Sequence, residues 1–215
     1  MTTKEKVQYI FIYLTLILFI LAVFFVITII VYNILKWSGY RKDENKKVFV
    51  DRIEKMKEIL ENNKTIDNYI GIGNDYYNLE EYSLAVSSYK KAIKIGGGSL
   101  VYSNIGNIYK DMGKYEKAEE SYLQSLEISP RQPDIYIKLF ELYKIPWKNR
   151  LYSPDAILEK GLSEMPDDPN ILINLADYCR DMGEKERAIG YYRRALGTQP
   201  DNDTIKEELT KLIKQ

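Results

Sequence analysis

Few residues of this 215-residue chain have the types and spacing that catalysis needs. The chain contains no histidine, so its composition excludes a histidine general base, a Ser-His-Asp triad and a histidine metal site. Cys179 is the one cysteine, which excludes an intrachain disulfide and a multi-cysteine zinc site. Basic and acidic residues number 31 each, so the net charge of zero argues against a surface dominated by nucleic-acid binding.

Three further features match a chemical motif only in part. Gly96-Gly97-Gly98 lacks the Lys-Ser/Thr that follows in a phosphate-binding loop, and it predicts a turn. Asp167-Asp168 lies between two prolines, as turn residues often do. Cys179 falls on an inward helix position, which favours a buried thiol over a nucleophile. The sequence therefore predicts no enzyme activity, no catalytic residue, no cofactor and no metal.

The surfaces of helices must then carry the function, and residues 102–130 indicate how those helices are built. Two amphipathic helices are predicted, over 102–111 and 115–128. Gly113 follows the first helix, where a left-handed backbone favours glycine. Pro130 follows the second helix, which cannot easily continue through a proline.

This spacing of small and aromatic residues recurs along the chain. Six residues precede their counterparts by 33 positions: Tyr69, Gly73, Tyr76, Ala85, Tyr89 and Ala92 correspond to Tyr102, Gly106, Tyr109, Ala118, Tyr122 and Ser125. Downstream, the same spacing relates Leu172, Leu175, Ala176, Ala188, Tyr192, Ala195 and Pro200. The pattern resembles the tetratricopeptide repeat (TPR). The resemblance implies an all-α superhelical solenoid over 66–202, in four copies: 66–98, 99–132, 133–168 and 169–202.

Two of these copies depart from the repeat pattern. The first has Gly97 in place of the closing proline and Glu80 in place of the turn glycine. The third is predicted to form helices over 133–144 and 154–164, and it is about two residues longer than its neighbours. We place the surplus at Ile145-Pro146-Trp147, between the two helices. A tolerated insertion is expected there, and a loop that contacts a partner is the alternative.

In TPR proteins the first helix of each repeat lines a concave groove. The resemblance carries this partner-binding role to ten residues: Asn74, Tyr77, Asn104, Asn107, Lys110, Lys138, Glu141, Asn174, Asp177 and Arg180. One TPR class grips the C-terminal carboxylate of chaperones with two lysines, two asparagines and an arginine. This sequence matches that set at Asn74 and Asn104 and partly at Lys138, but it has Ile70 and Asp134 where lysines are expected. The resemblance therefore favours a groove for some other peptide or helix, or a solvated face with binding elsewhere.

The region before the repeats predicts a membrane anchor. Residues 7–35 form a run of 29 residues without a charge, whereas roughly 20 apolar residues cross a bilayer. Tyr13 and Trp37 lie near the two ends of the run, as interfacial aromatics do. The run is too long for a cleaved signal peptide, and no A-x-A-like site follows it. Residues 1–37 are thus predicted to be a tail and a retained single-pass helix in the lipid bilayer.

The charges around this run indicate its orientation. Six basic residues follow it, at Lys36, Arg41, Lys42, Lys46, Lys47 and Arg52, whereas only Lys4 and Lys6 precede it. The positive-inside rule therefore favours a cytoplasmic repeat domain. Many bacterial anchors also begin with a short basic tail and export the remainder, so an extracytoplasmic (periplasmic) domain is the alternative.

Two further helices are predicted on either side of the repeats. Within residues 38–65, a helix over 43–63 carries an apolar stripe of Phe49, Ile53, Met56 and Leu60. This stripe either covers the first repeat or forms a seam between two copies of the chain. Thr65 is a candidate N-cap for the next helix. Within residues 203–215, a terminal helix with Ile205, Leu209, Leu212 and Ile213 on one face is predicted to cap the last repeat.

Together these features predict a membrane-anchored scaffold or adaptor that binds a partner protein or peptide, with no nucleic-acid partner. One alternative is an assembly or stability factor of an envelope complex with extracytoplasmic repeats, for example in secretion, cytochrome maturation or a flagellar-motor collar. Another is a structural oligomer built through the Phe49 stripe or the membrane helix.

Overall fold

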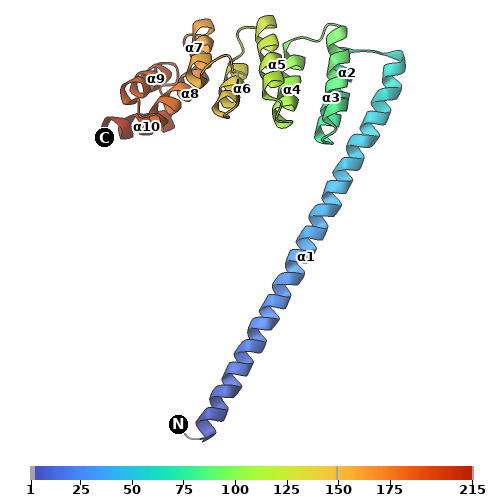
Figure 1. The fold of residues 1–215 in the computed structure, drawn as a ribbon, viewed down its shortest axis with the longest axis vertical. Helices are drawn as coiled ribbons and strands as arrows, with labels where there is room; N and C mark the ends of the chain where they lie inside the picture. Colours follow the sequence, from blue (N-terminus) through green and yellow to red (C-terminus); the bar gives the residue numbers. More distant parts are fainter. Residues whose placement is uncertain (1–2, 149, 215) are drawn as a thin grey trace. The chain divides into compact units, whose positions relative to one another are not determined.

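The computed structural model describes the backbone of residues 3–148 and 150–214, and the side chains of these residues except 3–22, 35–43 and 45. In this part of the chain every regular element is an α-helix (Figure 1). The chain divides into two compact units, Met1–Glu54 and Lys55–Gln215.

Helix α1 (Thr3–Asn62) makes up the first unit and extends into the second. The predicted anchor and the predicted helix over 43–63 are therefore parts of one continuous helix. The side chains of 7–22 and of residue 35, more than half of the predicted membrane span, lie outside the described residues. Within the described set, no helix has a stretch that is long and apolar enough to cross a bilayer.

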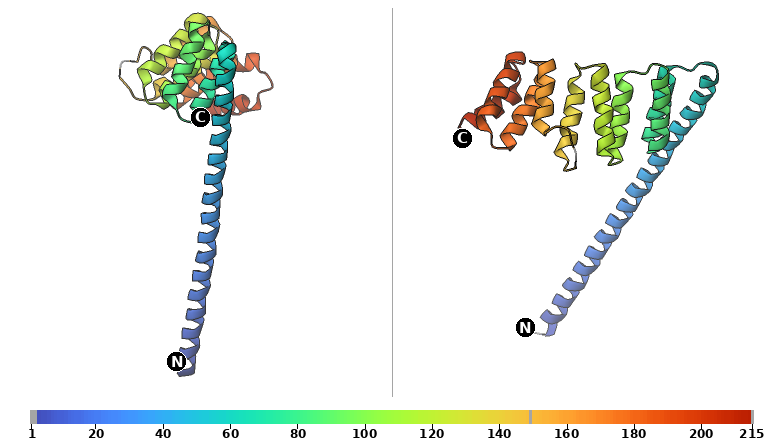
Figure 2. Two further views of the ribbon diagram at one scale, coloured as in Figure 1. Left: turned by 90° about the vertical axis from the view of Figure 1, so that its right-hand side faces the viewer. Right: turned by 45° about the horizontal axis from the view of Figure 1, so that its top comes forward.

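The second unit holds nine further helices among its described residues. They are α2 (Ile66–Asn78), α3 (Tyr82–Lys94), α4 (Ser99–Asp111), α5 (Tyr115–Ile128), α6 (Pro133–Lys144), α7 (Pro154–Glu164), α8 (Pro169–Asp181), α9 (Lys185–Thr198) and α10 (Asp203–Lys214). They stand side by side in chain order, as four helix-turn-helix pairs followed by α10 (Figures 1 and 2). The bounds of α5, α6, α7 and α10 agree with the predicted ones, whereas α4 begins three residues before Tyr102.

The turn inside three of the pairs has one residue with a left-handed backbone. Gly113 has a φ of 69° and Gly183 a φ of 79°, values that glycine adopts without a Cβ penalty. At the equivalent position of the first pair, Glu80 has a φ of 62°. The glutamate therefore adopts the backbone of a glycine, and the turn keeps its form.

Close packing inside the first two pairs depends on a glycine facing a tyrosine. A Cβ on Gly73 would lie 2.7 Å from the Tyr89 ring, and one on Gly106 would lie 2.5 Å from the Tyr122 ring. Both rings are almost fully buried, at 2% and 0% exposure. The missing side chain of the first helix thus makes the space that the aromatic of the second helix fills.

The third pair reverses this order of sizes, which explains why its sequence looks degenerate. Phe140 stands at the position of Gly106, and Leu158 stands at the position of Tyr122. Gly161 stands at a position that is small in the other pairs too, and a Cβ on it would lie 2.9 Å from the Tyr136 ring. The larger side chain of this pair of positions therefore lies on the first helix rather than on the second, and all of these positions remain buried.

The link between α6 and α7, where we placed the two surplus residues, is packed against the repeats. The Trp147 ring stacks on Tyr143 at 6.2 Å between centroids and lies 6.3 Å from Tyr115. The Trp147 indole N–H donates to the Leu142 carbonyl at 3.2 Å. The Tyr152 ring also lies 6.3 Å from Tyr143. The insertion therefore covers the end of α6, where Tyr143 is fully buried.

The buried carboxylate of Glu119, on α5, also holds this link in place. Glu119 is 6% exposed, and it accepts hydrogen bonds from the Tyr143 hydroxyl and, at 2.9 Å, from the Leu151 backbone N–H. Burial and the bond to Glu119 raise the pKa of Tyr143 above its usual value. The longer link thus completes the hydrogen bonds of a buried acid.

Short helical segments close both ends of the second unit. The Met56 side chain packs on α2 at Gly71, where a Cβ would lie 2.4 Å from the Met56 methyl, and Lys57 lies over the Tyr76 ring. Met56, one residue of the predicted apolar stripe, therefore packs on the first repeat, whereas Phe49 and Ile53 belong to the first unit. At the other end, α10 buries Ile205 and Leu212, but Ile213 is 53% exposed and does not belong to the predicted capping face.

Candidate functional site

The ten residues predicted to line a groove all lie on the first helices of the pairs, α2, α4, α6 and α8. We call the side that carries them the first-helix face. One interaction joins each neighbouring pair of these helices. The Tyr77 hydroxyl donates to Asp111 at 2.5 Å, and the Lys138 ammonium donates to the Ser103 hydroxyl at 2.9 Å. Between α6 and α8, the Phe140 ring meets the Tyr178 ring edge-on at 5.6 Å between centroids, and both rings line a cavity.

Three of the ten residues support the core with a side-chain oxygen. The Tyr89 hydroxyl donates to Asn74 at 2.5 Å, and the Tyr122 hydroxyl donates to Asn107 at 2.8 Å. In the fourth pair the Tyr192 hydroxyl donates in the same way to Asp177 at 2.5 Å. The side-chain amide N–H groups of both asparagines have no protein partner within the described residues, and they are the groups that a peptide could meet.

Tyr77 and Asn104 each take part in a hydrogen bond that affects the pKa of a tyrosine. The hydrogen bond from Tyr77 to Asp111 raises the pKa of Tyr77 to about 12. Burial raises the pKa of Tyr89 to about 12, while a hydrogen bond from Asn104 opposes the shift. Both tyrosines are therefore neutral hydrogen-bond donors at neutral pH.

Two cations and two amides form the middle of the face. Burial lowers the pKa of Lys138, the charge of Lys110 lowers it further, and Asp134 opposes the shift. The ammonium groups of α4 and α6 are thus close enough to repel each other. We call Asn104, Asn107, Lys110 and Lys138 the central patch. Its positive charge and its amide N–H groups, of which that of Asn107 has no partner among the described residues, suit a carboxylate or a peptide backbone carbonyl.

The C-terminal part of the face is hollow and acidic. Glu141, Asn174, Asp177 and Arg180 line a cavity of about 300 Å³ between α6 and α8. The Asn174 amide donates to the Asn170 carbonyl at 2.8 Å, and Glu141 pairs with Lys144 at 3.3 Å. Asp177 already holds Tyr192, so most polar groups of this cavity have a partner within the chain.

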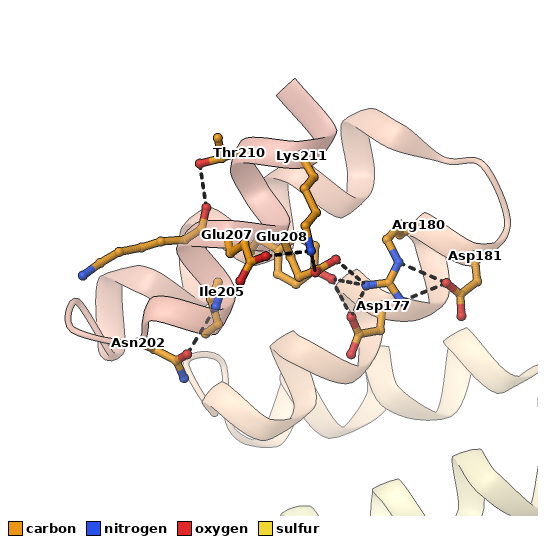
Figure 3. A network of polar contacts seen from close by, with 11 residues as sticks. Asp177, Arg180, Asp181, Asn202, Ile205, Glu207, Glu208, Thr210 and Lys211 are labelled. Carbon is orange, nitrogen blue, oxygen red and sulfur yellow. Dashed lines mark hydrogen bonds and ion pairs between the residues drawn. The ribbon is translucent and has the colours of Figure 1, made fainter. Parts of the chain in front are cut away.

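Arg180 has the most complete set of partners. Its guanidinium contacts Asp177 at 2.9 Å, Asp181 at 2.9 Å and Glu208 at 3.0 Å (Figure 3). It also donates to the Tyr192 hydroxyl at 3.0 Å. With three carboxylates around it, Arg180 joins α8 to α10 rather than offering a cation to a ligand.

Several partners of these residues were not predicted from the sequence, among them Asp111 and Glu208. Asp111 holds Tyr77, and Glu208 reaches Arg180 from α10. A signal for the core contacts was present in the sequence. An asparagine or aspartate stands 15 residues before a core tyrosine in three pairs. No comparable regularity marked Glu208, because the capping helix has no counterpart in the other repeats.

Family models named "Tetratricopeptide repeat" match residues 66–95, 99–132 and 171–206. These matches cover the first, second and fourth helix pairs, with α10 beginning inside the last. The chain is a tetratricopeptide repeat protein. The matched residues leave out the third pair, whose large and small core positions are exchanged.

Solved structures share this fold at low sequence identity. A structure described as the C-terminal part of a TPR repeat-containing protein from Cytophaga hutchinsonii has a TM-score of 0.62 and 16% identity, covering 82% of this chain and 69% of that one. A MamA structure has a TM-score of 0.57 and 18% identity, covering 76% of this chain and 95% of MamA. No curated protein matches the sequence. TPR domains typically bind protein or peptide partners, and they are generally scaffolds rather than enzymes.

Proposed function

We propose that this TPR protein is a membrane-anchored scaffold that holds a partner protein or peptide through the central patch of its first-helix face. The observation that carries the proposal is the position of Lys138. Its ammonium is partly withdrawn from water, bonded to Ser103 and placed near Lys110. Burial and the charge of Lys110 lower the pKa of Lys138 in spite of Asp134, so the charged form is disfavoured and an anionic ligand would stabilise it.

The ligand that fits this patch is an acidic peptide segment. A carboxylate would relieve the repulsion between Lys110 and Lys138, and the amides of Asn104 and Asn107 would bond to the backbone of the segment. Arg180 and its three carboxylates make the C-terminal part of the face a less suitable position for the same charge.

The membrane anchor in this proposal has support from the sequence and from the described part of α1. The uncharged run of 29 residues is long enough to span a bilayer. Ten large hydrophobic side chains between Val23 and Ile34 are 42% to 68% exposed. A water-soluble protein rarely exposes so continuous an apolar surface. The Thr28 hydroxyl donates to the Phe25 carbonyl at 2.7 Å, which satisfies it without water.

The patch is tested with the full-length protein and partners identified by proximity labelling in membranes. Asn104→Ala combined with Lys110→Ala should reduce capture of the main partner by about tenfold, because a cation and an amide donor are lost. Asn107 is left unchanged, because its removal would leave the Tyr122 hydroxyl unpaired. Lys206→Ala on α10 is the control and should capture the partner normally. Full capture by the double variant would show that the central patch is not the site.

The anchor is tested by deleting residues 1–37. The full chain should sediment with membranes and resist extraction by high salt, whereas the shortened protein should be soluble and helical by circular dichroism. Release of the full chain by salt alone would contradict the anchor.

The orientation, for which we propose a cytoplasmic repeat domain, is tested with Lys114→Cys in the full chain. Lys114 is exposed and its side chain forms no cap bond, whereas the native Cys179 is buried. A membrane-impermeant maleimide should label Lys114→Cys only after the cells are permeabilised. Labelling of intact cells would place the repeats on the outer side.

A further inference from the structure

A hollow of about 380 Å³ lies between α3, α4 and α5, outside the first-helix face. Ile93, Ile105 and Tyr109 form part of its apolar floor, and Lys90 and Lys94 stand on one rim. Ile105 and Tyr109 of α4 line the hollow, and they lie four positions apart on one side of that helix. Asn104 and Asn107 of the central patch lie on the opposite side of that helix. The volume of the hollow is within the range of small-ligand pockets.

On the α3 side this hollow carries the positive charges of Lys90 and Lys94, whereas Glu120 lines it on α5. Lys90, Lys91 and Lys94 have no ion pair within the part of the chain that the structure describes. A second hollow of about 400 Å³ continues along α3. It shares Lys90 and Lys94 with the first hollow and is also lined by Lys91. An occupant of the first hollow would therefore meet Lys90 and Lys94 on the α3 side.

In the third repeat, side chains of the protein itself cover the position that corresponds to this hollow. Tyr143 corresponds to Tyr109, one repeat later. The rings of Trp147 and Tyr152 pack on Tyr143, which is fully buried. Tyr109 is only partly buried, and its ring has the Lys117 ammonium over it at 5.7 Å. The second repeat lacks the longer link between its helices, which in the third repeat supplies Trp147 and Tyr152.

We propose that the hollow between α3, α4 and α5 binds a segment of a partner protein that presents an aromatic side chain next to carboxylates. The aromatic side chain would pack on Tyr109 and Ile105, as Trp147 packs on Tyr143 within this chain. The carboxylates would pair with Lys90 and Lys94. This surface is separate from the central patch, so the scaffold has two faces on which it can hold protein segments.

The test uses the full-length protein in a non-ionic detergent and a fluorescein-labelled peptide of sequence Asp-Glu-Trp-Leu-Glu-Asp, with binding followed by fluorescence anisotropy. The peptide should bind saturably. Replacing its tryptophan by serine should weaken binding at least tenfold, and so should replacing its four acidic residues by lysine. Added salt should weaken binding without abolishing it, because the aromatic contact does not depend on charge.

Variants of the protein locate the binding. Lys90→Glu combined with Lys94→Glu changes two exposed residues and should weaken binding at least tenfold. Gln124→Trp, at an exposed position that lines the hollow, should block it to a similar extent by filling the space. The charge-matched control is Lys185→Glu combined with Arg193→Glu on α9, where Arg193 corresponds to Lys90. The control and the Asn104→Ala/Lys110→Ala variant should bind within twofold of the wild type, and melting curves verify that all variants are folded.

Three results would overturn the proposal. The first is the absence of saturable binding of the tryptophan peptide to the wild type. The second is binding of the serine peptide as tight as that of the tryptophan peptide, which would show that only charge is read. The third is unchanged binding by both the lysine variant and Gln124→Trp. Binding of the full chain to anionic vesicles that depends on Lys90 and Lys94, without peptide binding, would assign the lysines to a lipid surface instead.

Discussion

At the scale of single residues, Glu80 is a glutamate with a backbone that suits glycine. Its φ of 62° is close to the 69° of Gly113, and a left-handed backbone costs a residue with a Cβ roughly 1–2 kcal/mol. We expect Glu80→Gly to raise the free energy of unfolding by about 1 kcal/mol, part of the gain being offset by the larger entropy of glycine in the unfolded chain. Urea denaturation measures the change.

Gly113→Ala is the reciprocal variant. No atom lies within 4 Å of a Cβ built there, so the substitution changes backbone strain without a clash. It should lower the free energy of unfolding by about 1 kcal/mol. Equal stability of both variants and the wild type would show that the left-handed turns do not limit stability.

Cys179 is a residue whose chemistry the fold suppresses. It is 0% exposed, and burial raises the pKa of its thiol to about 11. At about pH 8 only about a thousandth of such thiols are thiolates, which are the reactive form. We expect maleimide to leave the folded protein unlabelled at this pH and to label it quickly in urea. Rapid labelling of the folded protein would place Cys179 at an accessible surface.

The sequence and the structure agree least at the scale of residue partners. The repeat spacing placed Asn74, Asn107 and Asp177 on the correct helices, since each follows from the helical period. Their bonds to core tyrosines could not be predicted from surface position alone, because a groove asparagine and a core-supporting asparagine have the same spacing. Arg180 was predicted as a groove cation, yet three carboxylates surround it, one of them on α10.

At the scale of elements, the link between α6 and α7 acts as a cover for the third repeat. Truncating a fully buried tryptophan costs roughly 3–5 kcal/mol, and Trp147 is partly buried, so we expect Trp147→Ala to cost about 2 kcal/mol. Urea denaturation of the full chain tests this value.

Leu151→Ala is a control in the same link, because Leu151 is 65% exposed. It should change the free energy of unfolding by less than about 0.5 kcal/mol. If Trp147→Ala were equally silent, the link would be a tolerated insertion with no structural role.

The bounds of α5, α6, α7 and α10 were predicted well, whereas α1 was predicted as two separate helices and α4 was predicted to begin at Tyr102. Pro133 and Pro154 stand in the first turns of α6 and α7, and Gly113 and Gly183 follow α4 and α8. The exchange of large and small residues in the third pair was not predicted. Predicting it requires the positions of both helices in space, whereas the periodicity of a single helix shows only which residues face inward.

At the scale of the whole molecule, the tyrosines make stability depend on alkaline pH. The pKa values of Tyr77 and Tyr89 are raised to about 12, and burial also raises those of Tyr122 and Tyr192. Unfolded tyrosines lose their protons near pH 10, whereas the folded ones keep theirs. The unfolded state therefore binds fewer protons in this range, and stability should fall as the pH rises from about 10 to about 12.

The urea midpoint measured at about pH 8, 10 and 11.5 checks this expectation. It should change little between the first two values and drop clearly at the third. Tyr77→Phe removes one contributor and should make the drop smaller. A midpoint that stays constant up to about pH 12 would contradict the raised pKa values.

The buried core of the repeats has two parts of unequal size. One cluster holds seven buried residues, from Ala85 to Ile108, and the other holds 22, from Ala118 to Leu212. Segments with fewer buried contacts open at lower free energy. The amide hydrogens of α2 to α4 should thus exchange with deuterium sooner than those of α6 to α9.

The boundary between the clusters falls between α4 and α5, two of the helices that line the lysine-rimmed hollow. A segment bound there would add contacts across this boundary, so occupancy should slow the exchange of the amide hydrogens of α2 to α4.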